Sequence, residues 1–324
     1  MKGAHLMGKR ARSASITDAS ITSVITTCTS RKTARPTRSS TPISLSKAPQ
    51  RAFQTAWIER LSKLPASHSV SQLYAGRGFG LARGAAASVE ARLYVLSAGL
   101  GLVTSDSRVP VYGLTVAPGR AESVAARVQG DFDPAAWFEA LLKGPHSVQW
   151  ADTFGDGQGR VLISLTRPYA EMVGSSMRAL PARSLARLRI FGASLSAFLP
   201  SEVHCAIMPY DARLDAIIPG TRADFAQRAL DHFVREVARR VGYQDSETDI
   251  EAVRRTLAKA RAPERVRRPR QTDDEILRLI RKRLKAQSGI ARVLRALRDQ
   301  DGVACEQSRF SRLYRAVVEE DVLI

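Results

Sequence analysis

Short uninterrupted apolar runs alternate along this chain with longer stretches in which apolar residues recur every three or four positions. The uninterrupted runs predict buried strands at residues 23–28, 93–96, 160–165, 188–191 and 203–208. The periodic stretches predict helices at 52–64, 82–91, 133–144, 168–180 and 223–240. Strands separated by helices are typical of an α/β fold, here a Rossmann-like, mostly parallel sheet with flanking helices on both faces.

The second predicted strand runs directly into a stretch of different character. Leu93–Leu96 suits a buried strand, whereas Ser97–Val103 is small and glycine-rich and predicts a turn instead of more strand. Glycines at 99 and 101 allow the backbone to approach a ligand or a neighbouring loop with no Cβ in the way. A tight turn without any ligand is the alternative explanation.

The composition of the sequence changes after Tyr243. Residues 244–271 contain Pro263 and Pro269 among several arginines, which predicts a basic linker. Beyond it the pattern predicts three helices, the first capped by Thr272, with a turn at Asp301-Gly302 before the third. A helix followed by helix, turn and helix predicts an all-helical, helix-turn-helix-like module.

These patterns divide the chain into four parts. We expect a disordered basic leader at 1–20, the Rossmann-like α/β domain at 21–243, the basic linker at 244–271 and the helix-turn-helix-like module at 272–324.

The charge balance narrows the choice of partners. Fifty Lys and Arg against 31 Asp and Glu give a formal net charge of +19 and a pI of about 10.7. Such a chain attracts polyanions, so nucleic acid is the expected partner, DNA more than RNA; an arginine-rich protein without special affinity is the alternative. No segment approaches the roughly 18 to 20 apolar residues of a membrane-spanning helix, so no membrane partner is expected.

The cysteines and the known catalytic motifs exclude several classes of site. Cys28, Cys205 and Cys305 lie far apart without a CxxC spacing, which argues against a zinc site and against a disulfide framework, and favours a reducing, cytoplasmic location. The glycines of Tyr74–Gly80 do not complete a GxGxxG pattern, because Leu81 stands at its last position. The sequence therefore predicts no metal and no cofactor, and leaves open whether the protein is an enzyme.

Polar and basic residues follow three of the predicted strands. Because ligands of parallel sheets bind beyond the carboxyl ends of the strands, we expect these segments to form one anion or ligand site. Its candidate residues are Cys28, Ser30, Arg31, Lys32, Ser97, Gly99, Gly101, Tyr112 and Arg167.

The C-terminal helices carry a second group of candidates. Arginine, lysine and glutamine suit phosphates and base edges, so their exposed positions predict a DNA-binding surface. The candidates are Arg281, Lys282, Arg283, Lys285, Gln307, Ser308, Ser311, Arg312 and Arg315. A small bundle that dimerises or docks on the α/β domain is the alternative, so a homodimer or a partner protein stays open.

Part of the α/β domain resembles a known family. Leu96-Ser97-Ala98, then Gly101-Leu102-Val103, then Pro110, Tyr112 and Leu114, resemble the strand, turn and Pro-Tyr-x-Leu segment of the YaaA peroxide-stress proteins, with one extra residue between Pro110 and Tyr112. Thr26–Thr33 resembles the Cys-Ser-x-Arg-Lys stretch of related bacterial domains and of domains attached to archaeal transfer-RNA deazaguanine enzymes. The resemblance covers about residues 22 to 120 and implies an α/β fold and DNA binding linked to oxidative stress.

Together these observations predict a protein that binds nucleic acid, double-stranded DNA above all. DNA damage or oxidative stress, DNA modification and phage defence are the settings that fit. Two alternatives stay open: an enzyme acting on a nucleoside or nucleobase, as in deazaguanine-related glycosyl transfer, and a basic partner subunit of a larger assembly.

Overall fold

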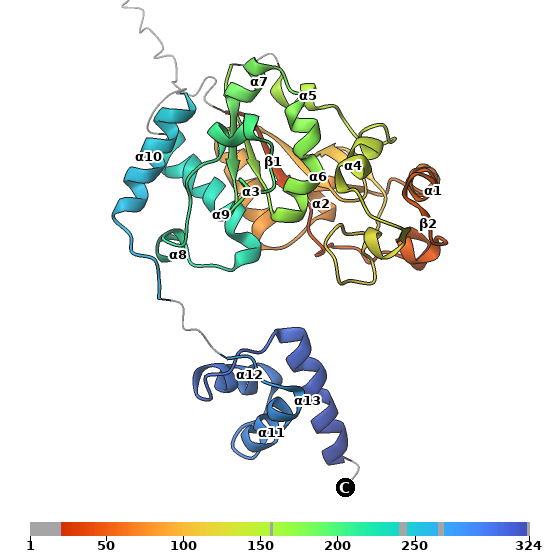
Figure 1. The fold of residues 1–324 in the computed structure, drawn as a ribbon, viewed down its shortest axis with the longest axis vertical. Coiled ribbons are helices and arrows are strands. Elements are labelled where there is room, and N and C mark those ends of the chain that lie inside the picture. The colour runs from red at the N-terminus through yellow and green to blue at the C-terminus, as the bar shows by residue number, and fades with distance from the viewer. Residues whose placement is uncertain (1–20, 156–157, 240–244, 265–268, 323–324) are drawn as a thin grey trace, which may run out of the picture. The chain divides into compact units, whose positions relative to one another are not determined.

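The computed structural model describes residues 21–155, 158–239, 245–264 and 269–322. The chain forms two compact units, Met1–Pro263, here called the α/β unit, and Glu264–Ile324, the helical unit (Figure 1). The predicted leader at 1–20 lies outside the described residues.

The α/β unit contains nine strands and ten α-helices within its described residues. Their bounds are β1 Ile21–Thr27, β2 Ala48–Pro49, α1 Gln50–Lys63, β3 His68–Ser69, α2 Val70–Leu73, α3 Arg77–Ser88, β4 Arg92–Ser97, β5 Gly101–Thr104, β6 Arg108–Val109, β7 Val128–Gln129, α4 Pro134–Leu142, α5 Trp150–Phe154, β8 Arg160–Ser164, α6 Arg167–Arg178, α7 Ala182–Arg187, β9 Leu188–Phe191, α8 Leu214–Ile217, α9 Phe225–His232 and α10 Ser246–Ala258. The sequence patterns located most of the long ones, and Asp133 caps α4 as predicted.

A five-stranded sheet organises this unit, and it is mostly parallel, as the sequence predicted. Four of its strands are predicted ones, and the fifth, β5, is not. The strand order is β5-β4-β1-β8-β9, and every neighbouring pair is parallel except β4 with β5. Ile25 at the centre of β1 lies opposite Tyr94 of β4 and Ile163 of β8. The strands that run parallel therefore bring Thr27, Ser97, Ser164 and Phe191 to one edge of the sheet.

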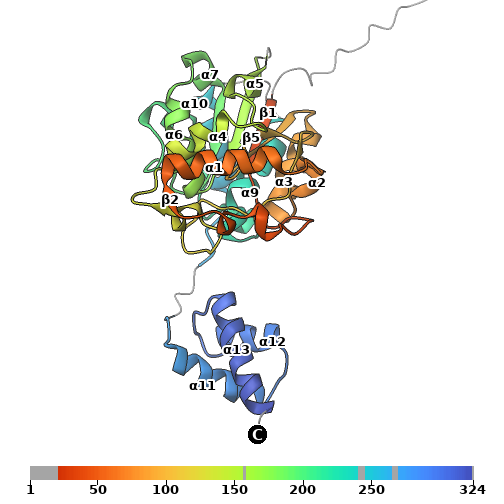
Figure 2. The same ribbon diagram turned by 90° about the vertical axis from the view of Figure 1, so that its right-hand side faces the viewer.

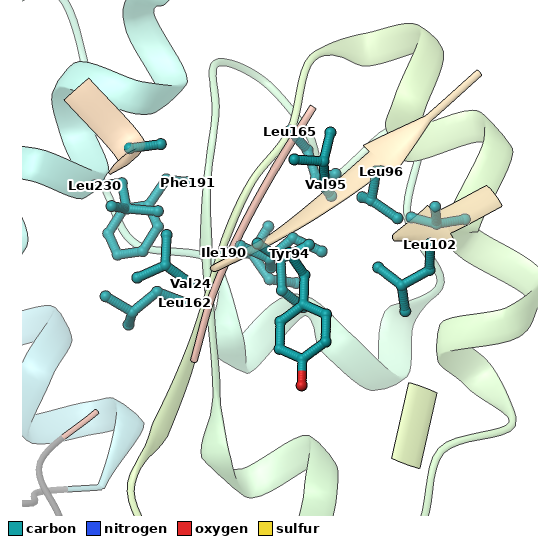
Figure 3. Packing of buried hydrophobic residues seen from close by; sticks show 14 of the residues in the cluster. Val24, Tyr94, Val95, Leu96, Leu102, Leu162, Leu165, Ile190, Phe191 and Leu230 are labelled. Carbon is teal, nitrogen blue, oxygen red and sulfur yellow. The ribbon is translucent and has the colours of Figure 1, made fainter. Parts of the chain in front are cut away.

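The core lies on both faces of this sheet. Apolar side chains of the strands are fully buried, among them Val24, Val95, Leu162 and Ile190 (Figure 3). Helices α3 and α9 pack on each other, as do α4 and α6, and helices flank the sheet in both views (Figures 1 and 2). Continuous apolar strands are what a sheet covered on both faces requires.

The glycine-rich stretch after β4 forms a strand, contrary to the sequence interpretation. Gly101–Thr104 returns antiparallel to β4 as β5, and Leu102 and Val103 are fully buried. The positive φ of 87° at Gly101 makes the tight reversal between the two strands. Small residues in 97–101 belong to the hairpin, and the apolar residues after them pair with the sheet.

The predicted fifth strand is also wrong. Ser201–Ala206 is a 3₁₀ helix, and only Ile207 forms a bridge, with Ile190 of β9. The predicted helix after it is present as α9, which continues as a π-helical segment over Phe233–Ala238. An apolar run of this length does not distinguish a strand from a buried helical turn.

The predicted linker contains a helix that belongs to the α/β unit. Helix α10 places Asp249 in the interior, where its carboxylate accepts hydrogen bonds from Arg160 of β8 at 2.7 and 2.9 Å and from Arg189 of β9 at 2.6 Å. All three side chains are buried. The α/β unit therefore extends to Pro263 instead of ending at 243.

The helical unit has its own core. Helices α11 Asp273–Leu284, α12 Ile290–Asp299 and α13 Gln307–Val322 bury Ile276, Ile280, Val293, Leu297 and Phe310 against one another. Thr272 caps α11 as predicted, accepting from the Glu275 amide. Segment 300–306 between α12 and α13 is longer than the three or four residues typical of a helix-turn-helix turn.

No helix within the described residues is both long enough and apolar enough to cross a membrane.

Candidate functional site

The connections of the sheet diverge between β1 and β8. From β1 the chain passes to β4 on one side, and from β8 it passes to β9 on the other. In open parallel sheets ligands bind at such a switch point, beyond the carboxyl ends of the strands. A pocket of about 450 Å³ lies there, called here the switch-point pocket. Its lining residues are Thr27, Cys28, Thr29, Ser30, Arg31, Ala75, Gly76, Arg77, Gly78, Phe79, Thr166, Tyr169, Thr221, Ala223, Asp224 and Gln227.

Helix α3 begins at the wall of this pocket. Its N-cap, Gly76, has a φ of 103° and no capping side chain, and Gly76, Arg77 and Gly78 line the pocket. The first amides of a helix lack intrahelical acceptors and carry a partial positive charge. This end of α3 therefore supplies polar backbone groups to the pocket.

A buried ion cluster adjoins the pocket at Asp224, next to the start of α3. The Arg228 guanidinium donates to Asp224 at 3.0 Å, to Asp215 at 2.9 Å and to the carbonyls of Ile218 and Thr221. Asp224 also accepts from the Thr221 amide at 2.8 Å and pairs with Arg77 at 3.3 Å. These bonds fix the segment before α9 and keep a carboxylate at the pocket.

Gln227 lines the pocket and carries a buried acceptor without a partner among the described residues. Its side chain is 4% exposed, and its Nε2 donates to Thr26 at 3.3 Å and to Thr27 at 3.4 Å. Its Oε1 has no hydrogen-bond partner in the described part of the chain. A buried polar atom without a partner costs about 1 to 3 kcal/mol, so a ligand N–H that reaches Oε1 gains from it.

A buried cluster of hydroxyl groups and a thiol adjoins the pocket at Cys28. The Cys28 Sγ lies 2.9 Å from the Tyr169 hydroxyl and 3.7 Å from that of Tyr112. The Tyr112 hydroxyl lies 2.6 Å from Ser97 Oγ and 2.8 Å from the Tyr74 hydroxyl. Several elements and loops of the unit thus converge on this cluster, here called the tyrosine cluster.

Lys32 covers the tyrosine cluster. Its Nζ lies 4.5 Å from the ring centre of Tyr112 and 5.5 Å from that of Tyr74, within cation–π range. Burial lowers the pKa of Lys32, because it disfavours the ammonium form. Burial also raises the pKa values of Tyr74, Tyr112 and Tyr169, so these phenols stay protonated at neutral pH.

The structure divides the predicted ligand site between these two places. Cys28, Ser30 and Arg31 line the switch-point pocket, whereas Lys32, Ser97 and Tyr112 belong to the tyrosine cluster. Arg167 does neither: its Nε donates to Glu171 at 2.9 Å and its guanidinium stacks on Phe198. The arginines expected to surround one anion are therefore separated.

Gly99 and Gly101 serve packing in the structure. A Cβ on Gly99 would lie 2.5 Å from the Tyr112 ring, and one on Gly101 would lie 2.9 Å from the Leu141 carbonyl oxygen. Both glycines thus admit protein atoms at close range, including the tyrosine of the cluster.

Sequence reasoning missed several residues of these sites. Tyr74, Gly76, Asp224 and Gln227 were not among the candidates, although each lies in the pocket or the cluster. A signal existed for Gly76, because a glycine-rich segment before a helix is typical of a ligand-binding turn. Gln227 looked like an ordinary helical position.

A larger hollow of about 740 Å³ lies between the π segment and α10. His232 is its most buried polar residue, and its Nδ1 is bonded to the Tyr210 hydroxyl at 2.9 Å. His232 already has a hydrogen-bond partner, and the hollow lies away from the switch point. The hollow is therefore a weaker candidate for the functional site than the switch-point pocket.

Two of the predicted DNA contacts in the helical unit are engaged within it. Arg283 donates to Asp301 at 2.6 and 2.8 Å, and Arg312 donates to Asp273 at 2.7 Å. Hydrogen bonds from Arg312 and Arg309 lower the pKa of Asp273. Two serines also bond locally, Ser308 to Glu306 and Ser311 to the Gln307 carbonyl.

The remaining candidates are exposed. Arg281, Lys282 and Lys285 lie on α11 or at its end, where Arg278 precedes them by three, four and seven positions and shares their face. Gln307 and Arg315 are exposed on α13. A cationic stripe therefore runs along α11.

Among the described residues no group of three or more His, Cys, Asp or Glu side chains is arranged to hold a metal ion. Comparisons of the chain with protein families, with curated proteins and with solved structures found no match. The resemblance to YaaA stays a prediction, and the function is argued below from the sites themselves.

Proposed function

We propose that this protein acts on nucleic acid and holds one nucleoside or nucleobase in the switch-point pocket. The observation that carries the proposal is the unpartnered Oε1 of Gln227, which has no hydrogen-bond partner among the described residues that surround the pocket. An amide oxygen beside the Asp224 carboxylate calls for a ligand that bears N–H groups. Nucleobase edges offer such donors, and glutamine is a common reader of them.

The remaining pocket features support a flat, polar ligand. Its volume of about 450 Å³ falls in the range of small-molecule sites. Phe79 and Tyr169 contribute aromatic walls, on which a base can stack. The net charge of +19 favours nucleic acid as the source of the nucleoside.

Replacing Gln227 with alanine is expected to weaken nucleoside binding about 5- to 100-fold, because one or two hydrogen bonds to the ligand are removed. Titration calorimetry with the full chain and adenosine, guanosine, cytidine or thymidine measures this. The matched control is Gln129→Ala, because Gln129 is exposed on β7, and this variant should leave nucleoside binding unchanged. No binding of any nucleoside by the wild-type chain, at millimolar concentration, contradicts the proposal.

A second function, duplex DNA binding by the helical unit, is favoured by the cationic stripe on α11. Phosphate contacts release counterions, so the affinity should fall by about a hundredfold or more between 50 and 200 mM salt if several phosphates are contacted.

The double variant Lys282→Ala, Lys285→Ala is expected to reduce the slope of log affinity against log salt by about 2, since each lysine that neutralises a phosphate contributes about 1 to that slope. Mobility shift or fluorescence anisotropy with one duplex over that salt range gives the slope. Lys63→Ala with Lys143→Ala removes the same charge from exposed positions of the α/β unit and should leave the slope unchanged. Equal slopes for both double variants would assign the binding to net charge alone.

A further inference from the structure

The sulfur of Cys28 lies where hydrogen-bond donors converge. Ser97 Oγ accepts from the Leu100 amide at 3.0 Å and can donate its own hydrogen to the Tyr112 oxygen at 2.6 Å. The Tyr112 hydroxyl then donates to Cys28 at 3.7 Å. The chain of hydroxyl groups thus ends on the sulfur.

Tyr169 lies on the other side of the same sulfur. Its hydroxyl is 2.9 Å from Cys28 Sγ and can donate to it. The phenols keep their protons, because burial raises the pKa values of Tyr112 and Tyr169. Two neutral donors directed at one sulfur stabilise its anionic form, the nucleophilic state of cysteine.

Positive charge also faces this sulfur. Lys32 lies over the tyrosine cluster and donates to the Thr29 carbonyl at 3.4 Å, one residue beyond Cys28. The first turn of α3, with its partial positive charge, lines the same pocket as Cys28. A cation and a helix N-terminus are the surroundings that make protein thiols reactive.

The pocket that Cys28 lines also contains a buried polar group without a partner among the described residues, an independent observation that favours a ligand there. Gln227 lies in the first turn of α9, whose N-cap is Asp224. It donates to Thr27 next to Cys28, and its buried Oε1 has no partner in the described part of the chain. Cys28 is half-buried and opens into that same pocket.

We propose that Cys28 is a nucleophilic site of the switch-point pocket, whose sulfur forms a covalent bond with an electrophilic carbon of the bound ligand. That the ligand is a nucleoside rests on the proposed function; the nucleophilic thiol does not. In the step a sulfur electron pair forms the S–C bond, and the C–X bond breaks with its pair leaving on X. The thiol proton passes to X, so that S–H and C–X become S–C and H–X. Tyr169 is a positioning residue in this step.

Iodoacetamide tests the thiol in the intact chain, because alkylation forms S–C and releases iodide. Cys205 is exposed and serves as the internal control, and Cys305 is buried. Peptide mass spectrometry over time gives all three rates at once. At pH 7 Cys28 should react roughly tenfold faster than Cys205 although it is less exposed.

Tyr169→Phe keeps the ring and removes one donor. It should lower the Cys28 rate several-fold and leave the Cys205 rate unchanged, whereas a general loss of structure would raise the Cys305 rate. The alkylation rates are measured without any nucleoside, so failure of nucleoside binding and failure of the nucleophile are distinguishable. A Cys28 rate equal to or below that of Cys205 at pH 7 overturns the proposal.

Discussion

Replacing Asp249 with alanine is expected to lower the free energy of unfolding of the α/β unit by about 3 to 5 kcal/mol. The carboxylate is 1% exposed and accepts hydrogen bonds from two fully buried arginines, Arg160 and Arg189. Its removal leaves two guanidinium groups in the interior without the anion that they share. This is the most costly kind of change to a buried ion cluster.

Urea unfolding followed by tryptophan fluorescence measures this loss. All three tryptophans, Trp57, Trp137 and Trp150, lie in the α/β unit, so the signal does not report on the helical unit. Glu251→Ala, an acidic residue exposed on the same helix, is the matched control and should change stability by less than about 0.5 kcal/mol. A loss below about 1 kcal/mol for Asp249→Ala would show that α10 is only loosely attached to the sheet.

Asp249 also shows where sequence reasoning fails. Its helix lies next to a segment rich in charge, and its apolar face is short, so the pattern of 244–271 predicts a linker. The stabilising partners, Arg160 and Arg189, stand in β8 and β9, far away along the chain. A tertiary ion cluster leaves no local pattern, whereas continuous apolar strands such as β1 and β8 do.

The sequence predicted where the switch-point pocket lies, but only some of the residues that line it. Parallel strands alone imply a ligand site at their carboxyl ends, which drew attention to Cys28 and Arg31. Gln227 lies 200 residues after Thr27, to which it donates, and nothing local marks it or Asp224. Arg167 illustrates the opposite error, because its neighbours Glu171 and Phe198 engage a side chain that its position in sequence assigned to the site.

The tyrosine cluster contains some residues that the sequence indicated and others that only the fold brings to them. The family resemblance points to Tyr112 and the strand end to Ser97, yet only the fold brings Tyr74 and Tyr169 to them. The hairpin of β4 and β5 makes this possible, since Gly99 leaves room for the Tyr112 ring. The glycines and the proposed nucleophilic thiol are therefore parts of one arrangement.

Replacing Gly101 with alanine is expected to lower the stability of the α/β unit by about 2 to 5 kcal/mol. The left-handed backbone, with a φ of 87°, costs a residue with a Cβ about 1 to 2 kcal/mol. The new Cβ would also lie 2.9 Å from the Leu141 carbonyl oxygen and 2.6 Å from Ser147 Oγ, and overpacking of this kind costs about 1 to 3 kcal/mol. Ser147 bonds the Leu102 amide at 3.0 Å, so the clash weakens the attachment of β5.

Replacing Gly119 allows the cost of the left-handed backbone to be measured apart from the steric cost of the new Cβ. It has a similar φ of 78°, but a Cβ there would meet no atom within 4 Å, so Gly119→Ala should show the backbone cost alone. Urea unfolding of both variants by tryptophan fluorescence gives the steric part as their difference. Equal losses would remove the packing argument for Gly101. Unchanged stability with abolished nucleoside binding would instead return Gly101 to the role that its sequence first indicated, close approach of the backbone to a ligand.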